Sequence, residues 1–163
     1  MEPQWLDEEE RAAWLRLVSV TELLPGILDA QLRRDSGLTH FEYLVLAMLS
    51  EAPERTLRMS WLARRTNATL PRLSHVVKRL EDRGLVTRVR SASDARATDA
   101  SLTDAGWEQI VEAAPHHVRF VRERILDQLT PQQVTALGEI AGAVLTSLDP
   151  SGDLTMRAAD APH

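Results

Sequence analysis

The chain has 163 residues, no cysteine and a formal net charge of −5. The lack of cysteine excludes a disulfide framework, a thiolate metal site and a cysteine-based redox switch. No apolar run approaches the roughly 20 residues that a membrane-spanning helix needs, and the first residues lack the basic and apolar regions of a signal peptide. These features predict a cytoplasmic protein made of one domain or one compact subunit.

Charge is divided unevenly along the sequence. Between Arg55 and Arg96 there are 11 basic residues and three acidic ones, a net charge of +8, whereas the remainder of the chain carries −13. A basic segment within an acidic protein is typical of a surface that binds nucleic-acid phosphates. The alternative is an ordinary solvated surface that happens to be rich in arginine. The elements predicted within this segment favour the first interpretation.

The N-terminal part of the chain predicts two helices. Apolar residues recur at helical spacing over residues 14–32, and Pro25-Gly26 is expected to kink this first helix or divide it in two. Gly37 follows as its end. Thr39 and Glu42 then form the pattern of a capping box, which begins a short and largely buried second helix.

The basic segment predicts two short helices joined by a tight turn. Ser60 can cap a helix over 61–66, and Thr69 can cap a second helix that runs to about Arg83 and ends before Gly84. Apolar residues of the second helix are spaced i, i+3, i+4, i+7, which predicts one buried stripe. This is a helix-turn-helix arrangement, whose second helix fits the DNA major groove. Its outer face presents Pro71, Arg72, Ser74, His75, Lys78 and Arg79.

Residues 85–102 predict a β-hairpin, because two β-prone runs flank a loop of small residues. Arg88 and Arg90 lie near its base and Arg96 near its tip, as in the wing of a winged helix-turn-helix. An arginine at the tip suits the negative potential of a narrow minor groove. Asp94 is expected to hold the guanidinium of Arg96 in a fixed orientation.

The C-terminal part predicts two more helices. A long helix over 104–129 is expected to break or kink near Pro115. A second capping box begins at Thr130 and starts a final amphipathic helix that ends at about residue 148. Residues 149–163 are predicted to be a disordered tail.

This order of elements resembles the multiple-antibiotic-resistance regulator (MarR) family over roughly residues 12–148. The resemblance implies a mainly α fold with a small β wing. In that fold residues 37–103 form the winged helix-turn-helix lobe that binds DNA, and residues 1–36 and 104–148 form a helical dimerisation region. The stretches that carry the resemblance are Gly37-Leu38-Thr39, Leu80-Glu81-Asp82-Arg83-Gly84-Leu85-Val86, Asp94-Ala95-Arg96 and Leu102-Thr103-Asp104-Ala105-Gly106.

The resemblance also implies a function: a homodimer that binds a pseudo-palindromic operator in double-stranded DNA, usually as a repressor that a small ligand relieves. By position, Arg72, Ser74 and His75 fall where the family's recognition helix reads bases, and Arg96 falls on its wing-tip arginine. His75 stands where many relatives have arginine. The resemblance therefore implies how the chain docks on DNA but not which operator sequence it reads. The full set of expected DNA contacts is Thr69, Pro71, Arg72, Ser74, His75, Lys78, Arg79, Arg88, Arg90, Asp94 and Arg96.

In proteins that this chain resembles, a ligand pocket lies where the N-terminal helices, the long helix and the DNA-binding lobe meet. A small aromatic or amphipathic effector is expected there, and no cofactor is expected. The alternative is that the aromatic residues are simply part of the core. The candidate lining residues are Trp14, Tyr43, Met48, Met59, Trp61 and Trp107.

The sequence also bears on three other functions. Glu112 and His116 lie four residues apart and His40 begins another helix, which allows a carboxylate–imidazole site and hence a zinc-type regulator of the same fold. An enzyme is not favoured, because the sequence has neither a nucleophile elbow nor a phosphate-binding loop. A winged helix without an inducer, used for protein contacts, is the third alternative.

Overall fold

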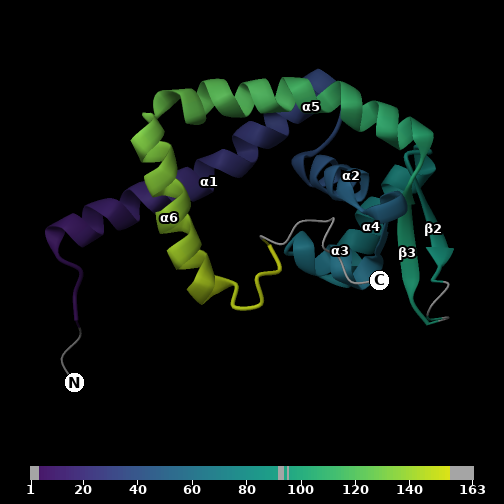
Figure 1. The fold of residues 1–163 in the computed structure, drawn as a ribbon, viewed down its shortest axis with the longest axis horizontal. Helices are drawn as coiled ribbons and strands as arrows, with labels where there is room; N and C mark the ends of the chain where they lie inside the picture. Colours follow the sequence, from purple (N-terminus) through teal and green to yellow (C-terminus); the bar gives the residue numbers. More distant parts are fainter. Residues whose placement is uncertain (1–3, 92–93, 95, 155–163) are drawn as a thin grey trace.

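The computed structural model describes residues 4–91, 94 and 96–154. Three long helices, α1 (Glu8–Ser36), α5 (Asp104–Arg124) and α6 (Pro131–Leu148), extend from a smaller lobe of short helices and strands (Figure 1). The lobe contains, in chain order, α2 (His40–Glu51), the 3-10 turn η1 (Pro53–Arg55), β1 (Thr56–Arg58), α3 (Met59–Arg65), α4 (Leu70–Asp82), β2 (Val86–Arg90) and β3 (Thr98–Leu102). Within the described ranges, no helix is both long and apolar enough to span a membrane.

Side-chain caps begin α2 and α6 where the sequence predicts them. Thr39 and Glu42 form a reciprocal capping box at α2, and Thr130 and Gln133 form another at α6. Each box satisfies backbone N–H groups that the first helical turn leaves without partners. Asp7 begins α1 in the same way, although the sequence reading did not identify this cap.

Neither Pro25 nor Pro115 divides its helix, so the predicted breaks are wrong. Helix α1 continues through Pro25 to Ser36, and α5 continues through Pro115. A proline removes only one hydrogen bond from the ladder, so a long helix with intact turns on both sides can continue. Helix α5 nevertheless ends at Arg124, earlier than predicted, and the short 3-10 turn η2 (Leu126–Gln128) follows it.

The core of the lobe lies between α2, α3, α4 and a three-stranded antiparallel sheet. The sheet order is β1-β3-β2, with Val86 opposite Leu102 and Thr56 opposite Ser101. Strand β1 was not predicted. Its place at the edge is reinforced by a hydrogen bond of 2.8 Å between the hydroxyls of Thr56 and Ser101.

Helix α5 is joined closely to this core at its first turn. A Cβ built on Gly106 would overlap the carbonyl oxygen of Leu85, so any larger residue would force this contact apart. The Thr103 hydroxyl donates to the Gly84 carbonyl (2.7 Å) and accepts from the Gly106 N–H (3.0 Å). The end of the wing and the start of α5 are therefore fixed to the end of α4.

The segment after α6 also departs from the prediction. Residues 149–154 fold back onto α3, where the Gly152 carbonyl accepts from the Arg65 guanidinium at 3.0 Å and the Asp153 carbonyl accepts from it as well. The Asp153 carboxylate lies 3.4 Å from the same group, whose side chain is only 2% exposed. A buried cation needs such partners, which explains why this part of the predicted tail is ordered against the lobe. Residues 155–163, the rest of that prediction, lie outside the described residues.

Candidate nucleic-acid interface

The helix-turn-helix consists of α3 and α4. Helix α3 begins at Met59, with Arg58 in the N-cap position, so Ser60 lies inside the helix and does not cap it as predicted. Thr69 does cap α4, since its side chain accepts from the Arg72 N–H at 3.4 Å. Asn67 takes up the turn between the helices with a φ of +49°.

Helix α4 has two distinct faces, as its sequence predicts. Its apolar stripe, Leu73, Val76, Val77 and Leu80, is buried. After α4, Gly84 adopts a φ of +72°, a left-handed conformation that favours glycine and turns the chain into β2. The stripe thus fixes which side chains of α4 face outward, and those are polar or basic.

At the start of α4 the outward side chains are available to a groove. Arg72 and His75 are exposed, and Ser74 is partly exposed. The Arg72 guanidinium lies over the ring of Phe41 from α2, with Cζ 4.7 Å from the ring centroid. This end of a recognition helix is the part that can reach base edges.

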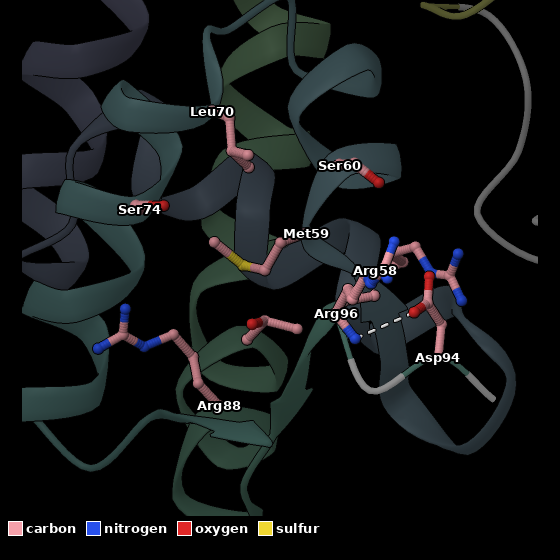
Figure 2. Close-up of a pocket in the computed structure, with 10 residues that line it drawn as sticks. Arg58, Met59, Ser60, Leu70, Ser74, Arg88, Asp94 and Arg96 are labelled. Atoms are coloured by element: carbon pink, nitrogen blue, oxygen red, sulfur yellow. Dashed lines mark hydrogen bonds between the residues drawn. The ribbon is translucent and has the colours of Figure 1, made fainter. Parts of the chain in front are cut away.

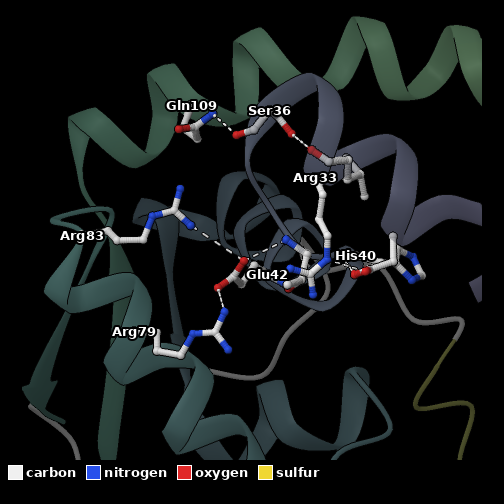
Figure 3. A network of polar contacts seen from close by, with 10 residues as sticks. Arg33, Ser36, His40, Glu42, Arg79, Arg83 and Gln109 are labelled. Atoms are coloured by element: carbon white, nitrogen blue, oxygen red, sulfur yellow. Dashed lines mark hydrogen bonds and ion pairs between the residues drawn. The ribbon is translucent and has the colours of Figure 1, made fainter. Parts of the chain in front are cut away.

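Further along α4, the basic side chains have acidic partners. Lys78 pairs with Asp82 at 2.6 Å, and Arg79 pairs with Glu42 of α2 at 2.5 Å. The Glu42 carboxylate is 2% exposed, and Arg83 lies 3.7 Å from its other oxygen. Figure 3 shows Arg79 and Arg83 converging on Glu42. The Arg79 pair therefore joins α4 to α2.

The wing consists of β2, β3 and the residues between them. Arg88 in β2 donates through Nε and Nη2 to Glu81 at 3.1 and 2.7 Å, and its backbone N–H donates to the same carboxylate at 3.1 Å. The side-chain hydrogen bond from Arg88 is the main reason that the pKa of Glu81 is lowered. Arg90 is exposed. Arg88 therefore connects the wing to α4.

At the wing tip one prediction needs correction. The Asp94 carboxylate accepts a hydrogen bond of 3.0 Å from the backbone N–H of Arg96, and no ion pair joins these two described side chains. Aspartate commonly bonds the backbone two residues on, which stabilises a turn. Asp94 thus shapes the loop that carries Arg96 and leaves the Arg96 guanidinium exposed.

A cavity of about 330 Å³ lies between the helix-turn-helix and the wing. Figure 2 shows arginines from β1 and the wing around it, with hydroxyl groups on the side of α3 and α4. Cationic and hydroxyl groups around a concave surface suit a strand of nucleic-acid backbone. The lining residues are Arg58, Met59, Ser60, Leu70, Ser74, Arg88, Asp94, Arg96, Ala97 and Thr98.

Comparison with known proteins identifies the family. The MarR family model matches residues 36–97. The HTH-type transcriptional repressor Rv2887 of Mycobacterium tuberculosis is 39% identical over 98 residues, which is 60% of this chain and 68% of that protein. The chain belongs to the MarR family.

Two solved structures extend the MarR match over most of the chain. Sco3205, a MarR family transcriptional regulator from Streptomyces coelicolor in complex with DNA, superposes with a TM-score of 0.87 at 44% identity. That match covers 99% of this chain and 97% of the other. AbsC, a MarR regulator from the same organism, gives a TM-score of 0.85 at 37% identity and covers 90% of this chain and 98% of its own.

In this MarR chain, the six residues predicted to line an effector pocket lie in different surroundings. Met59 and Trp61 are buried in the lobe core, and the partly buried Tyr43 and Met48 pack against that core. Trp14 is exposed on α1, and Trp107 carries the Arg55 guanidinium 4.1 Å from its ring centroid. Of the six, Met59 lines the cavity between α4 and the wing.

The residues predicted for the metal alternative do not meet either. His116 is exposed and its Nδ1 lies 3.3 Å from Arg119, while Glu112 is exposed on the same helix. Among the described residues, no group of three or more histidine, aspartate or glutamate side chains is arranged to hold a metal ion. The geometry therefore gives the zinc-type alternative no support.

The structure instead places His117, which the sequence reading missed, at the junction of α1, α2 and α5. Its Nδ1 lies 2.8 Å from Oε1 of the buried Gln31, and its ring centroid lies 4.5 Å from that of Tyr43. Gln31 donates its amide to Asp35 at 3.0 Å, so its oxygen accepts and the His117 Nδ1 donates. His117 follows Ile110 and Ala113 at intervals of seven and four, a signal that would have assigned it to the inward face.

Proposed function

We propose that two copies of this chain bind a pseudo-palindromic DNA operator and repress transcription, with α4 in the major groove of each half-site. The observation that carries the proposal is the division of α4 into a buried apolar stripe and an outward face that begins with Arg72. Dimeric helix-turn-helix proteins place their recognition helices about one helical turn of DNA apart, roughly 34–36 Å. The relative Sco3205 was solved with DNA, which supports this docking.

We assign different roles in DNA binding to the interface residues, according to the side chains that they already contact. Arg72, Ser74 and His75, with Thr69 and Pro71 beside them, lie at the end of α4 that would face base edges. Arg90 and Arg96 extend from the wing toward the backbone and the minor groove. Lys78, Arg79 and Arg88 already pair with carboxylates, so we assign them a smaller share of the attraction to phosphates.

The dimer in this proposal is formed by the helices outside the lobe, residues 1–36 and 104–148. Apolar side chains remain exposed along α1 and α6. Extended apolar surfaces of this kind mark protein interfaces. We also propose that a small aromatic or amphipathic effector relieves repression, and the half-buried Tyr43 and His117 at the junction of α1, α2 and α5 support a ligand contact there.

The function is tested with operator DNA, identified by mapping the sites that the protein occupies on its genome, and with a random duplex of the same length. Arg72→Ala is expected to lower operator affinity by about tenfold to a hundredfold and to change random-duplex affinity little, because a base contact is lost. Arg96→Ala is expected to weaken both complexes and to reduce the salt slope by about one, because a phosphate contact is lost.

Arg119→Ala is the matched control, since Arg119 is an exposed arginine of α5 outside the interface. It is expected to bind both duplexes as the unchanged protein does. Equal losses on both duplexes for Arg72→Ala, or undiminished binding by Arg96→Ala, would contradict the assigned parts. The effector proposal is tested by titrating aromatic carboxylates into the operator complex. Binding of such a compound is expected to release the DNA.

A further inference from the structure

The first turn of α2 contacts the recognition helix through two consecutive residues. The Phe41 ring lies beneath Arg72, 4.7 Å from Cζ, and the Glu42 carboxylate binds Arg79 at 2.5 Å. Arg72 and Arg79 are seven residues apart, so they lie two turns apart on nearly the same face of α4. One short stretch of α2 thus holds α4 at two levels.

The contact between Glu42 and Arg79 fixes the rotation of α4 about its axis. Glu42 is 2% exposed, and its Oε2 also accepts the Thr39 N–H at 2.8 Å, so the carboxylate is fixed by the cap of its own helix. A buried carboxylate without cationic partners is costly, so Glu42 favours the contact with Arg79, whose own side chain is 48% exposed. Because Arg79 is held, the direction in which the first turn of α4 projects is also set.

The contact between Phe41 and Arg72 acts on the Arg72 side chain itself. An exposed arginine has many rotamers, and it must select one to present a planar pair of donors to a base. Stacking on an aromatic face restricts the guanidinium to one plane before DNA arrives. Phe41 is half-buried against the lobe core, so its ring is itself held in place.

We propose that Phe41 is a positioning residue for sequence recognition, whose ring orients the Arg72 guanidinium toward a base edge. Phe41 lies outside the set of residues expected to touch DNA and acts through Arg72. The inference rests on the proposed base contact of Arg72. It predicts that specificity depends on an aromatic ring at position 41, and not merely on an apolar side chain there.

The test replaces Phe41 by leucine, which keeps apolar volume without a ring, and by tyrosine, which keeps the ring. Phe41→Leu is expected to reduce the ratio of operator to random-duplex affinity about two- to fivefold, with random-duplex affinity unchanged. Phe41→Tyr is expected to keep the ratio of the unchanged protein. Phe41→Met, also apolar and without a ring, replaces the leucine variant if that chain does not fold.

A double-mutant cycle separates this inference from the proposed function. In an Arg72→Ala background, Phe41→Leu is expected to cause no further loss of specificity. Three outcomes would overturn the inference. Phe41→Leu could keep full specificity, or it could lose affinity equally for operator and random duplex. It could also reduce specificity as much in the Arg72→Ala background as in the unchanged protein. If Arg72→Ala retains specificity, the proposed base contact of Arg72 is wrong. If Arg72→Ala loses specificity but Phe41→Leu does not, the base contact stands and only the role of Phe41 is wrong.

Discussion

The winged helix-turn-helix lobe and the long helices differ in how well one chain covers their apolar residues. In the lobe, side chains such as Leu46, Leu62 and Leu73 have no exposed surface. In α6, fully within the described ranges, no residue is buried, and Ile140 is 64% exposed. The lobe is therefore a folded unit within one chain, whereas the helices around it present a surface that a second copy would cover.

The exposed apolar positions follow a pattern that fits such a partner. Along α6 they recur every three or four residues, so they lie along one side of the helix. Helix α1 repeats this spacing over its N-terminal two thirds. The positions are Trp14, Leu17, Val20, Leu23 and Ile27 on α1, and Val134, Leu137, Ile140, Val144 and Leu148 on α6.

The largest effect is expected from a charge placed on that surface. Ile140→Glu leaves the lobe untouched but would place an unpaired carboxylate in the proposed dimer interface, which costs several kcal/mol. We expect monomers at micromolar concentration, and a loss of operator affinity of more than about a hundredfold because two half-sites are no longer bound together. Sedimentation velocity and operator titration measure the two results.

Thr135→Glu is the matched control, since Thr135 lies on the opposite side of α6 from the apolar stripe and is also exposed. It adds the same charge to the same helix and is expected to remain dimeric. A dimeric Ile140→Glu protein would show that α6 is not part of the interface.

A smaller effect, at the junction between the lobe and α5, is expected from Gly106→Ala. The new methyl group would meet the Leu85 carbonyl and the Leu102 side chain, so α5 must move away from the wing. Such overpacking typically costs about 1–3 kcal/mol of unfolding free energy. Urea unfolding at a fixed protein concentration measures this loss, and self-association is expected to persist.

Gly142→Ala in α6 serves as the comparison, because a Cβ there meets nothing within 4 Å. Alanine favours a helix more than glycine does, so this variant is expected to be as stable as the unchanged protein or slightly more stable. Equal stability of Gly106→Ala would mean that the contact between the wing and α5 can relax at little cost.

The sequence predicted those features that depend on neighbouring residues. Caps at Thr39, Thr69 and Thr130, the turn at Gly84 and the two faces of α4 each follow from interactions within one or two turns. The MarR resemblance then supplied the arrangement of these elements, and the comparisons confirm it.

Features that depend on distant partners were not predictable in this way. Strand β1 has only three residues and exists through pairing with β3, more than 40 positions away. The partner of Arg79 is Glu42, 37 residues earlier in the chain, although acidic residues lie much closer in sequence. Asp94 was assigned to the Arg96 guanidinium because charge suggested it, but the nearer backbone N–H takes that carboxylate. The choice between a local and a distant partner depends on packing that periodicity does not contain.

The smallest effect is expected where the two regions meet, and it concerns pH. Burial is the main cause that lowers the pKa of both His40 and His117, and the neighbouring His40 lowers the pKa of His117 further. The Asp29 carboxylate acts in the opposite direction on His40. Because the folded protein resists protonation of these rings, the unfolded chain binds more protons once the pH falls through the ordinary histidine value of about 6.5.

Stability is therefore expected to decrease as the pH is lowered from 7.5 to 5.5, and to decrease less in His117→Gln. That variant also loses the hydrogen bond to Gln31 at every pH, so the informative quantity is the change in unfolding free energy between the two pH values. His116→Gln is the matched control, because it makes the same substitution at the adjacent residue of α5, which is exposed. An identical pH dependence in His117→Gln would mean that His117 is protonated as readily in the folded protein as in the unfolded chain. The junction of α1, α2 and α5 would then tolerate a charge, and the neutral hydrogen bond from Nδ1 to Gln31 would not be what holds the ring in place.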